Sequence, residues 1–247
     1  RDSVLTHRAD WFGCACCPAN LARLIASVDE YLYTVNDDTI LSHQFISNEA
    51  EFDDGIKISQ TNHFPWSGDI HYEITNSEGK AFKLGIRIPN WSANFELEIN
   101  GVSTTLPLND GFIYVDVDVE SLVIDLKLDM DVKVMRASNR VNDDFGKVAI
   151  QRGPIVYAAE GTDNEAPLSL YEVATDAKTD YHFDESLLDG VGVVNVSAKL
   201  QKADSKDAPL YVDASEQVDS TDAELTMVPY YAWANRENGK MRVWLNK

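Results

Sequence analysis

Three cysteines lie within four positions of the chain, and the other 244 residues contain none. They are Cys14, Cys16 and Cys17, and Pro18 follows the adjacent pair directly. Thiolates bind zinc and act as nucleophiles, and a bound metal keeps a thiol deprotonated. The clustering therefore favours a zinc site or a cysteine nucleophile over the alternative of three small buried residues at a helix start.

The spacing of these cysteines argues against a disulfide framework, which would spread its cysteines along the chain. Adjacent Cys16 and Cys17 are also poor geometric partners for each other. We therefore expect reduced, metal-bound or catalytic thiols in a reducing compartment, and place the protein in the cytoplasm. A structural zinc site usually needs four ligands, so some ligands of a metal site would lie outside this chain.

The histidines and acidic loops are weaker candidates for metal binding. His43, His63 and His71 are not separated as in a compact metal motif, and we do not expect them to bind a metal. The run Asn142-Asp143-Asp144 offers oxygen ligands of the kind calcium takes, but the twelve-residue pattern flanked by helices is absent. Asp116, which alternates with valines, is expected on the solvent face of a strand.

The residues after the cysteines predict one helix, from about Asn20 to Tyr31. Its apolar positions follow the spacing i, i+3, i+4, i+7 and i+11, and they are Leu21, Leu24, Ile25, Val28 and Leu32. Pro18 suits the first helical turn, where its missing N–H costs nothing. The cysteine pair thus lies at or just before a helix N-terminus, where backbone N–H groups and the helix dipole favour a thiolate.

From Tyr31 onward the period of the hydrophobic pattern changes to two. Alternation runs through residues 82–88, 95–99 and 122–134, and further strands are expected at 148–157, 191–196 and 241–245. Asn100-Gly101 supplies a hairpin turn. Many short strands with one polar face predict antiparallel sandwiches or barrels.

Composition and charge exclude several classes of partner. Hydrophobic residues make up 44% of the chain and charged residues 25%, as in ordinary globular proteins, and 247 residues allow one or two domains. The net charge of −20 opposes binding to nucleic acid, and no apolar run approaches the roughly 18 residues of a membrane span. The chain opens on Arg1 rather than Met, and we expect a piece of a longer protein.

The run WFGCACCPANLAR, residues 11–23, resembles the corresponding segment of glycoside hydrolase family 127, whose type activity is that of a β-L-arabinofuranosidase. Four further segments are similar to the same family in the same order, and they are residues 64–69, 87–91, 146–157 and 229–244. Where the family often has a second proline, this chain has Ala19.

The resemblance implies a longer parent with an N-terminal (α/α)6 barrel followed by β-sandwich domains. We therefore expect a mainly β chain in which a terminal helix of the missing barrel precedes two antiparallel β-sandwich domains. Residues 1–32 would end the incomplete catalytic barrel, and residues 33–137 would form the first sandwich. Residues 138–247 would form the second, with a last strand that is free to return to the first.

The resemblance also implies the site and the reaction. In the family, three cysteines and a glutamate hold a zinc ion, and the adjacent pair corresponds to Cys16 and Cys17, with Cys16 as the nucleophile of a retaining glycosidase. The substrate would be an arabinose-containing oligosaccharide with a non-reducing-end β-L-arabinofuranoside. Cys14 is not carried over as a ligand. The third cysteine and both functional glutamates lie upstream in the family, so we expect the isolated chain to be inactive and to bind zinc weakly or not at all.

Two other interpretations stay open. The first is a non-catalytic carbohydrate-binding or scaffold β-sandwich protein, for which exposed tryptophans lining a groove and buried, metal-free cysteines would be evidence. Buried sandwich tryptophans are commoner, and we expect the four after residue 60 to be packed. The second is a short zinc-binding module fused to a sandwich, which needs ligands that this chain lacks.

Without the barrel, the apolar face of the predicted helix would repack on a sandwich, form a homodimer or be partly disordered.

Overall fold

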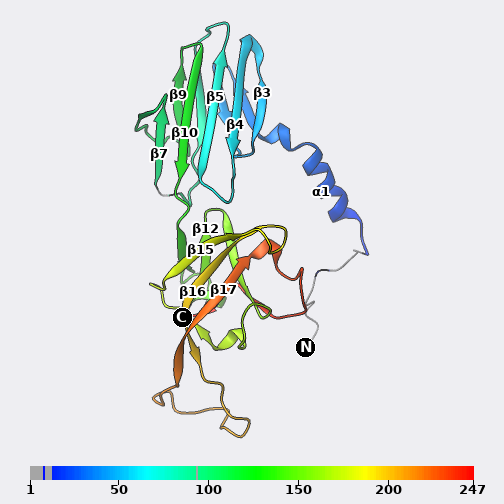
Figure 1. The fold of residues 1–247 in the computed structure, drawn as a ribbon, viewed down its shortest axis with the longest axis vertical. Helices are drawn as coiled ribbons and strands as arrows, with labels where there is room; N and C mark the ends of the chain where they lie inside the picture. The colour runs from blue at the N-terminus through cyan, green and yellow to red at the C-terminus, as the bar shows by residue number, and fades with distance from the viewer. Residues whose placement is uncertain (1–7, 9–12, 93) are drawn as a thin grey trace. The chain divides into compact units, whose positions relative to one another are not determined.

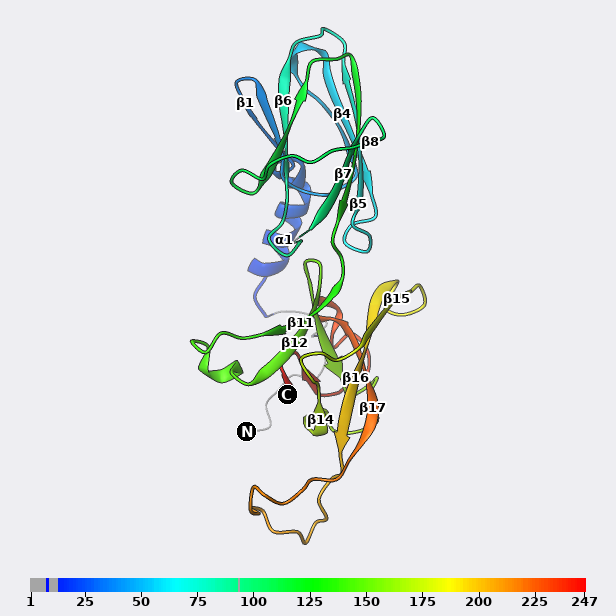
Figure 2. The ribbon, with the colours of Figure 1, turned by 90° about the vertical axis from the view of Figure 1, so that its left-hand side faces the viewer.

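The computed structural model describes Arg8 and residues 13–92 and 94–247. Contacts divide the chain into two compact units, a sandwich unit of residues 11–130 and a C-terminal unit of residues 1–10 and 131–247. The sequence placed domain boundaries after residues 32 and 137. The contacts divide the chain after residue 130, because strand β11 (Val132–Arg136) pairs with β12 (Lys147–Arg152) in the C-terminal unit. Figure 1 shows the course of the chain, and Figure 2 labels both strands.

The sandwich unit starts with helix α1 (Cys16–Ala26) and the short 3-10 helix η1 (Val28–Tyr31), and two sheets follow. Their strands are β1 (Tyr33–Asn36), β2 (Thr39–Ser42), β3 (Asn48–Glu51), β4 (Ile56–Asn62), β5 (Asp69–Asn76), β6 (Phe82–Arg87), β7 (Phe95–Ile99), β8 (Val102–Ser103), β9 (Phe112–Val117) and β10 (Ser121–Leu128). A 3-10 turn, η2 (Asp53–Gly55), precedes β4. One sheet has the order β1-β2-β6-β9 and the other β3-β4-β5-β10-β7-β8.

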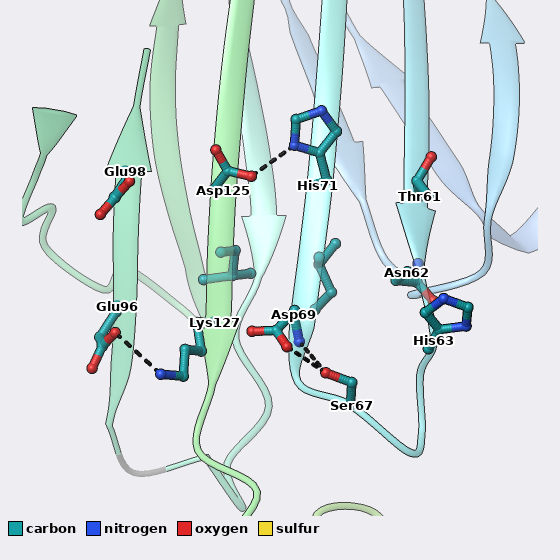
Figure 3. Close-up of a pocket in the computed structure, with 12 residues that line it drawn as sticks. Thr61, Asn62, His63, Ser67, Asp69, His71, Glu96, Glu98, Asp125 and Lys127 are labelled. Carbon is teal, nitrogen blue, oxygen red and sulfur yellow. Dashed lines mark hydrogen bonds and ion pairs between the residues drawn. The ribbon is translucent and has the colours of Figure 1, made fainter. Parts of the chain in front are cut away.

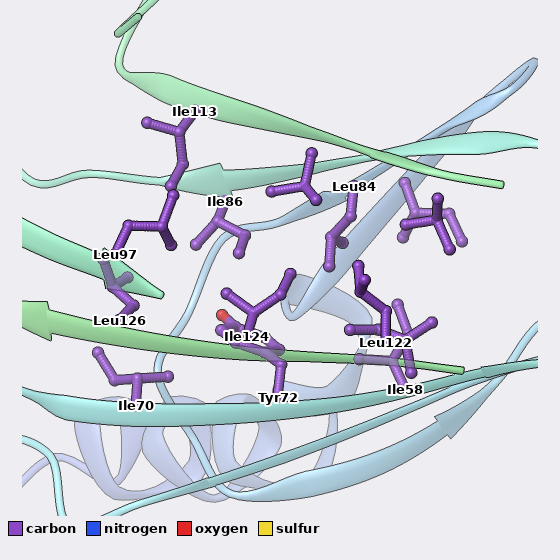
Figure 4. Close-up of a cluster of buried hydrophobic side chains, with 14 of the residues drawn as sticks. Ile58, Ile70, Tyr72, Leu84, Ile86, Leu97, Ile113, Leu122, Ile124 and Leu126 are labelled. Atoms are coloured by element: carbon purple, nitrogen blue, oxygen red, sulfur yellow. The ribbon is translucent and has the colours of Figure 1, made fainter. Parts of the chain in front are cut away.

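The core of the sandwich unit lies between the two sheets, as the period-two pattern predicts (Figure 4). In β10 the apolar residues Leu122, Ile124 and Leu126 are buried, while Asp125 between them faces out. Burying an aliphatic side chain of this size stabilises the fold by about 1.5–3 kcal/mol. The predicted hairpin turn is confirmed, because Asn100 and Gly101 both have positive φ, as a type I′ turn requires.

Helix α1 ends earlier than the sequence predicts. It ends at Ala26, where the Ser27 N–H donates to the Leu24 carbonyl at 3.2 Å and the Ser27 hydroxyl to the Arg23 carbonyl at 3.1 Å. These bonds tighten the last turn, and Val28 continues in η1. No residue of α1 is buried, so the predicted apolar face is solvent-exposed. No described helix is long and apolar enough to cross a membrane.

The C-terminal unit is built from one sheet that closes on itself. Its remaining strands are β13 (Ile155–Glu160), β14 (Tyr171–Glu172), β15 (Thr179–Asp184), β16 (Val191–Gln201), β17 (Ser220–Pro229), β18 (Met241–Arg242) and β19 (Leu245–Asn246), joined in part by the 3-10 turns η3 (Asn142–Asp144), η4 (Leu168–Leu170) and η5 (Tyr230–Ala232). The long strands β16 and β17 pair over much of their length (Figure 2). The ring β12-β19-β14-β16-β17-β13 is closed by pairing of β13 with β12. The last strand, β19, stays in this unit.

Buried charges fix the segment after β17 in the C-terminal unit. The Arg236 guanidinium donates to both carboxylate oxygens of Asp163 at 2.6 Å and to Glu160 at 2.7 Å. The free oxygen of Glu160 accepts the Ala234 N–H at 2.9 Å. The hydrogen bonds to Asp163 and then Glu160 raise the pKa of Arg236 above its ordinary value. The side chains of this cluster are mostly withdrawn from solvent.

Arg8 is bound to the same C-terminal segment, far from it in sequence. Its backbone N–H donates to the Ala234 carbonyl at 2.8 Å. Its guanidinium donates to the carbonyls of Trp233 and Tyr231, both at 3.1 Å, and lies 5.2 Å from the centre of the Trp233 ring. Arg8 therefore belongs structurally to the C-terminal unit although it precedes the sandwich unit in sequence.

Candidate functional site

The three thiols lie together at the start of α1. Cys16 and Cys17 are the first residues of the helix, and Cys14 lies in the bend before it. The Cys14 thiol donates to the Cys16 sulfur at 3.3 Å, and the sulfurs of Cys16 and Cys17 are 3.9 Å apart. All three are free and exposed. The predicted position at the helix start is confirmed, and none of the three cysteines is buried within the 247-residue chain.

The local sequence leaves the helix N-terminus open. Ala15 occupies the N-cap position and its side chain makes no capping hydrogen bond, and the first turn contains no acidic residue. Only a few described contacts brace the turn, among them the Asn20 side chain donating to the Cys16 carbonyl at 2.9 Å. The partial positive charge of the helix end is therefore available to an anion such as a thiolate.

The adjacent pair has the sulfur spacing that one zinc ion requires. Zinc–sulfur bonds of about 2.3 Å in a tetrahedron place two sulfurs about 3.8 Å apart, and the Cys16 and Cys17 sulfurs are 3.9 Å apart. The distance from Cys14 to Cys16 is shorter, at 3.3 Å. In the described part of the chain, no group of three or more His, Cys, Asp or Glu side chains could hold a metal. Cys16 and Cys17 thus fit as part of a zinc site.

A groove on the outer face of the second sheet is the other candidate site (Figure 3). There His71 of β5 contacts Asp125 of β10, with Nδ1 2.7 Å from the carboxylate oxygen, and its Nε2 is 3.4 Å from Glu73. The hydrogen bond to Asp125 raises the pKa of His71. Asp125 also lies directly opposite Glu98 of β7. A protonated His71 therefore offsets the repulsion of facing carboxylates, a stabilising role.

The sequence did not reveal the pair of His71 and Asp125. The two residues are 54 positions apart, and only the pairing of β5 with β10 brings them opposite each other. Asp125 carried one usable signal, since it occupies a polar position within the alternating run of β10. That signal predicts which face of the sheet Asp125 lies on, but it does not predict which strand lies beside β10.

The other polar candidates make local contacts of their own. His63 lines the groove with His71, whereas the His43 ring contacts the Thr34 hydroxyl at 2.9 Å. Burial, and then Arg87, lower the pKa of His43. In the loop suggested for calcium, the Lys147 ammonium donates to the Asp143 carbonyl at 2.7 Å. The same ammonium lies 3.8 Å from the Asp144 carboxylate, so a lysine already offsets part of the negative charge of this loop.

Asp116 and the tryptophans have the surroundings that the sequence predicts. Asp116 faces solvent, as predicted, and accepts a hydrogen bond from Lys83 at 2.6 Å. The four tryptophans after residue 60 are half-buried, and they are Trp66, Trp91, Trp233 and Trp244. The Trp91 ring stacks on Phe64 with centroids 6.2 Å apart. Among the described residues, no exposed tryptophan forms a platform for sugars.

Two family models match consecutive parts of the chain. The middle domain described as "Beta-L-arabinofuranosidase, GH127 middle domain" matches residues 39–130, and the "Glycoside hydrolase family 127 C-terminal domain" matches residues 132–246. Their junction coincides with the division between the two compact units. Together the two models account for most of the chain.

Characterised and solved proteins are similar over nearly the whole chain. A non-reducing end β-L-arabinofuranosidase of Bifidobacterium longum subsp. longum is 49% identical over 99% of this chain and 39% of that protein. The crystal structure of a GH127 β-L-arabinofuranosidase from Geobacillus stearothermophilus T6 matches with a TM-score of 0.91 and 36% identity, over 98% of this chain and 39% of that one. A second GH127 β-arabinofuranosidase gives 0.86 and 31%, over 97% and 40%. The chain spans about two fifths of these relatives.

Proposed function

Because the chain belongs to glycoside hydrolase family 127, we propose that it is the cysteine-bearing part of a glycosidase that releases non-reducing-end β-L-arabinofuranosyl residues from oligosaccharides. The names of the relatives support this substrate class. The observation that carries the proposal is the exposed cysteine pair at the first turn of α1.

Cys16 acts as the nucleophile in this proposal. Cys16 is an exposed residue at the start of a helix whose N-terminus has no side-chain cap. In a retaining mechanism the sulfur bonds to the anomeric carbon, the leaving oxygen takes a proton, and water then releases the sugar. The proton donor is the family glutamate, which the resemblance assigns to the barrel rather than to this chain.

Zinc is the proposed cofactor, with Cys16 and Cys17 as two of its ligands. Their sulfur spacing of 3.9 Å supports a shared ion. When bound, zinc would hold the thiols deprotonated at neutral pH. The resemblance assigns the third cysteine and the ligand glutamate to the barrel. We therefore expect the 247-residue chain alone to bind zinc weakly and to lack glycosidase activity.

The barrel is also the proposed cover for the exposed apolar face of α1. Ile25 is 66% and Leu21 58% exposed, and no described part of the sandwich unit buries either residue. A homodimer through the same face is the alternative. Sedimentation of the 247-residue chain distinguishes the two, because a monomer at high concentration contradicts the homodimer.

The test uses an enzyme that includes the barrel and measures hydrolysis of an aryl β-L-arabinofuranoside. We expect Cys16→Ser to lower kcat at least about 10³-fold, as loss of a nucleophile does. Cys14→Ser is the matched control, and in reducing buffer it should keep turnover of the same order as the wild type. Near-normal turnover of Cys16→Ser would contradict the assignment of the nucleophile.

The non-catalytic carbohydrate-binding protein gains no support from the structure. Buried cysteines and exposed tryptophans along a groove would support that interpretation, whereas the cysteines are exposed and the described tryptophans are half-buried. Titration of the 247-residue chain with arabino-oligosaccharides tests it directly. Binding that survives in the Cys16→Ser and Cys17→Ser variants would revive the alternative.

A further inference from the structure

We propose that Cys14 forms a reversible disulfide with Cys16, making this turn a site of thiol oxidation by peroxides. The family resemblance gives Cys14 no part in metal binding or catalysis, yet its thiol contacts the sulfur of Cys16 at 3.3 Å. The effect on glycosidase activity rests on the proposed function, whereas formation of the disulfide does not.

Geometry favours Cys14 over Cys17 as the partner of Cys16. The sulfur of Cys14 is closer to Cys16 than that of Cys17, at 3.3 Å against 3.9 Å. Consecutive residues joined by a trans peptide have Cα atoms about 3.8 Å apart, below the roughly 4.4–6.8 Å that disulfides span. One residue separates Cys14 from Cys16, so this restriction does not apply to that pair.

The backbone around Cys14 also permits the bond to form. Cys14 lies in a bend outside the helix, so it can turn toward Cys16 without disturbing the hydrogen bonds of α1. All three cysteines are exposed residues, so no described part of the chain covers this turn against a small oxidant. Exposure and a helix N-terminus are the surroundings in which thiols oxidise selectively.

The chemistry requires only a peroxide and ends in water. The Cys16 thiol gives up its proton, the thiolate attacks one oxygen of hydrogen peroxide, and the O–O bond breaks, so that Cys16 becomes a sulfenic acid and the departing hydroxide takes the released proton and leaves as the first water. The Cys14 sulfur then attacks the Cys16 sulfur, the S–O bond breaks, and the second water leaves with the proton of Cys14. Two thiols are oxidised, and one peroxide is reduced to two waters.

This bond would cap the reactive sulfur and protect it. A disulfide sulfur is neither a nucleophile toward the anomeric carbon nor a thiolate ligand, so the proposed site is off until a thiol reductant releases it. Without a neighbouring thiol, a sulfenic acid proceeds to the sulfinic and sulfonic acids, which reductants do not restore. Cys14 therefore converts irreversible damage into a reversible state.

Mass spectrometry of the 247-residue chain tests the proposal. The reduced, chelator-treated protein is exposed to hydrogen peroxide, and its remaining thiols are alkylated. Wild type should lose two hydrogens, regain them with a thiol reductant, and keep Cys17 as the one alkylated cysteine. Cys17→Ser, the matched control, should form the same disulfide. Cys14→Ser should instead gain oxygen atoms on Cys16 that the reductant does not remove.

Three outcomes would overturn the proposal. They are a two-hydrogen loss in Cys14→Ser at the wild-type rate, oxidised wild type in which Cys14 is the alkylated cysteine, and disulfide-linked dimers as the main product. A second arm uses the barrel-containing enzyme, in which reductant should restore peroxide-treated wild type but not Cys14→Ser. If no sample is active before oxidation, the proposed function fails while the mass result still decides the disulfide.

Discussion

The sandwich unit joins two regions of opposite character, its β core and its helix α1. Nineteen of the described residues form the buried core of the two sheets, including Ile124 at 0% exposure. Helix α1 carries the thiols and has no buried residue, with Ile25 66% exposed. Packing and candidate chemistry are therefore separated within this unit, because the described core residues include no cysteine and the turn that carries the thiols buries no side chain of α1.

The sharpest test of this contrast replaces isoleucine by alanine in each region. Ile124→Ala leaves a cavity between the sheets and should lower the free energy of unfolding by about 3–4 kcal/mol. Ile25→Ala removes an exposed side chain from a helix that alanine favours, and should change it by less than about 0.5 kcal/mol. Urea unfolding followed by circular dichroism measures both. A loss at Ile25 as large as that at Ile124 would show that α1 is buried in solution.

Substitution of a buried charged group in the C-terminal unit should lower the stability of the fold, as substitution in the β core does. Arg236→Ala leaves the carboxylates of Glu160 and Asp163 without their partner, and should destabilise the fold by about 2–3 kcal/mol. The exposed pair of Lys199 and Asp222 is the control, and Lys199→Ala should leave the unfolding midpoint unchanged. Equal effects of the two substitutions would remove the distinction between buried and exposed charges in this unit.

The smallest expected effect is the pH dependence from His71. The pKa of His71 is raised in the folded state, so its contribution is fully present below its ordinary value of about 6.5 and is lost as pH rises through the folded value. The pair with Asp125 is well exposed, which limits the effect to about 0.5 kcal/mol. Thermal unfolding between about pH 5.5 and 8.5 measures this dependence. His71→Gln should flatten it, and an unchanged slope would assign it to other groups.

Local sequence patterns predicted where strands lie in the chain better than they predicted where each strand ends. Alternation located β6, β7 and β10, and Pro18 indicated the start of α1. The same parity ran on through Val132 and Val134, although the chain leaves the sheet after Leu128. There the Asp129 N–H donates to the Ser92 hydroxyl at 2.9 Å, a contact that no local pattern contains.

For the candidate site, too, the sequence predicted the position of the residues but not their detailed geometry. Residue types and spacing located the cysteines, but the sulfur distances depend on the bend before α1 and on side-chain torsions. These distances distinguish Cys14 from Cys17 as partners of Cys16. The role of Cys16 as nucleophile and the zinc ligation by Cys16 and Cys17 remain proposals, because the remaining groups of that site are expected in the barrel.

The attachment of Arg8 makes the C-terminal unit a poor candidate for free exchange between proteins. A gene segment that encodes residues 131–247 alone omits Arg8, and with it three hydrogen bonds and the cation that covers the Trp233 ring. Shuffling at the junction after residue 130 would thus deliver a C-terminal unit without these contacts. The complete unit is inherited only together with Arg8, which precedes the cysteines in sequence.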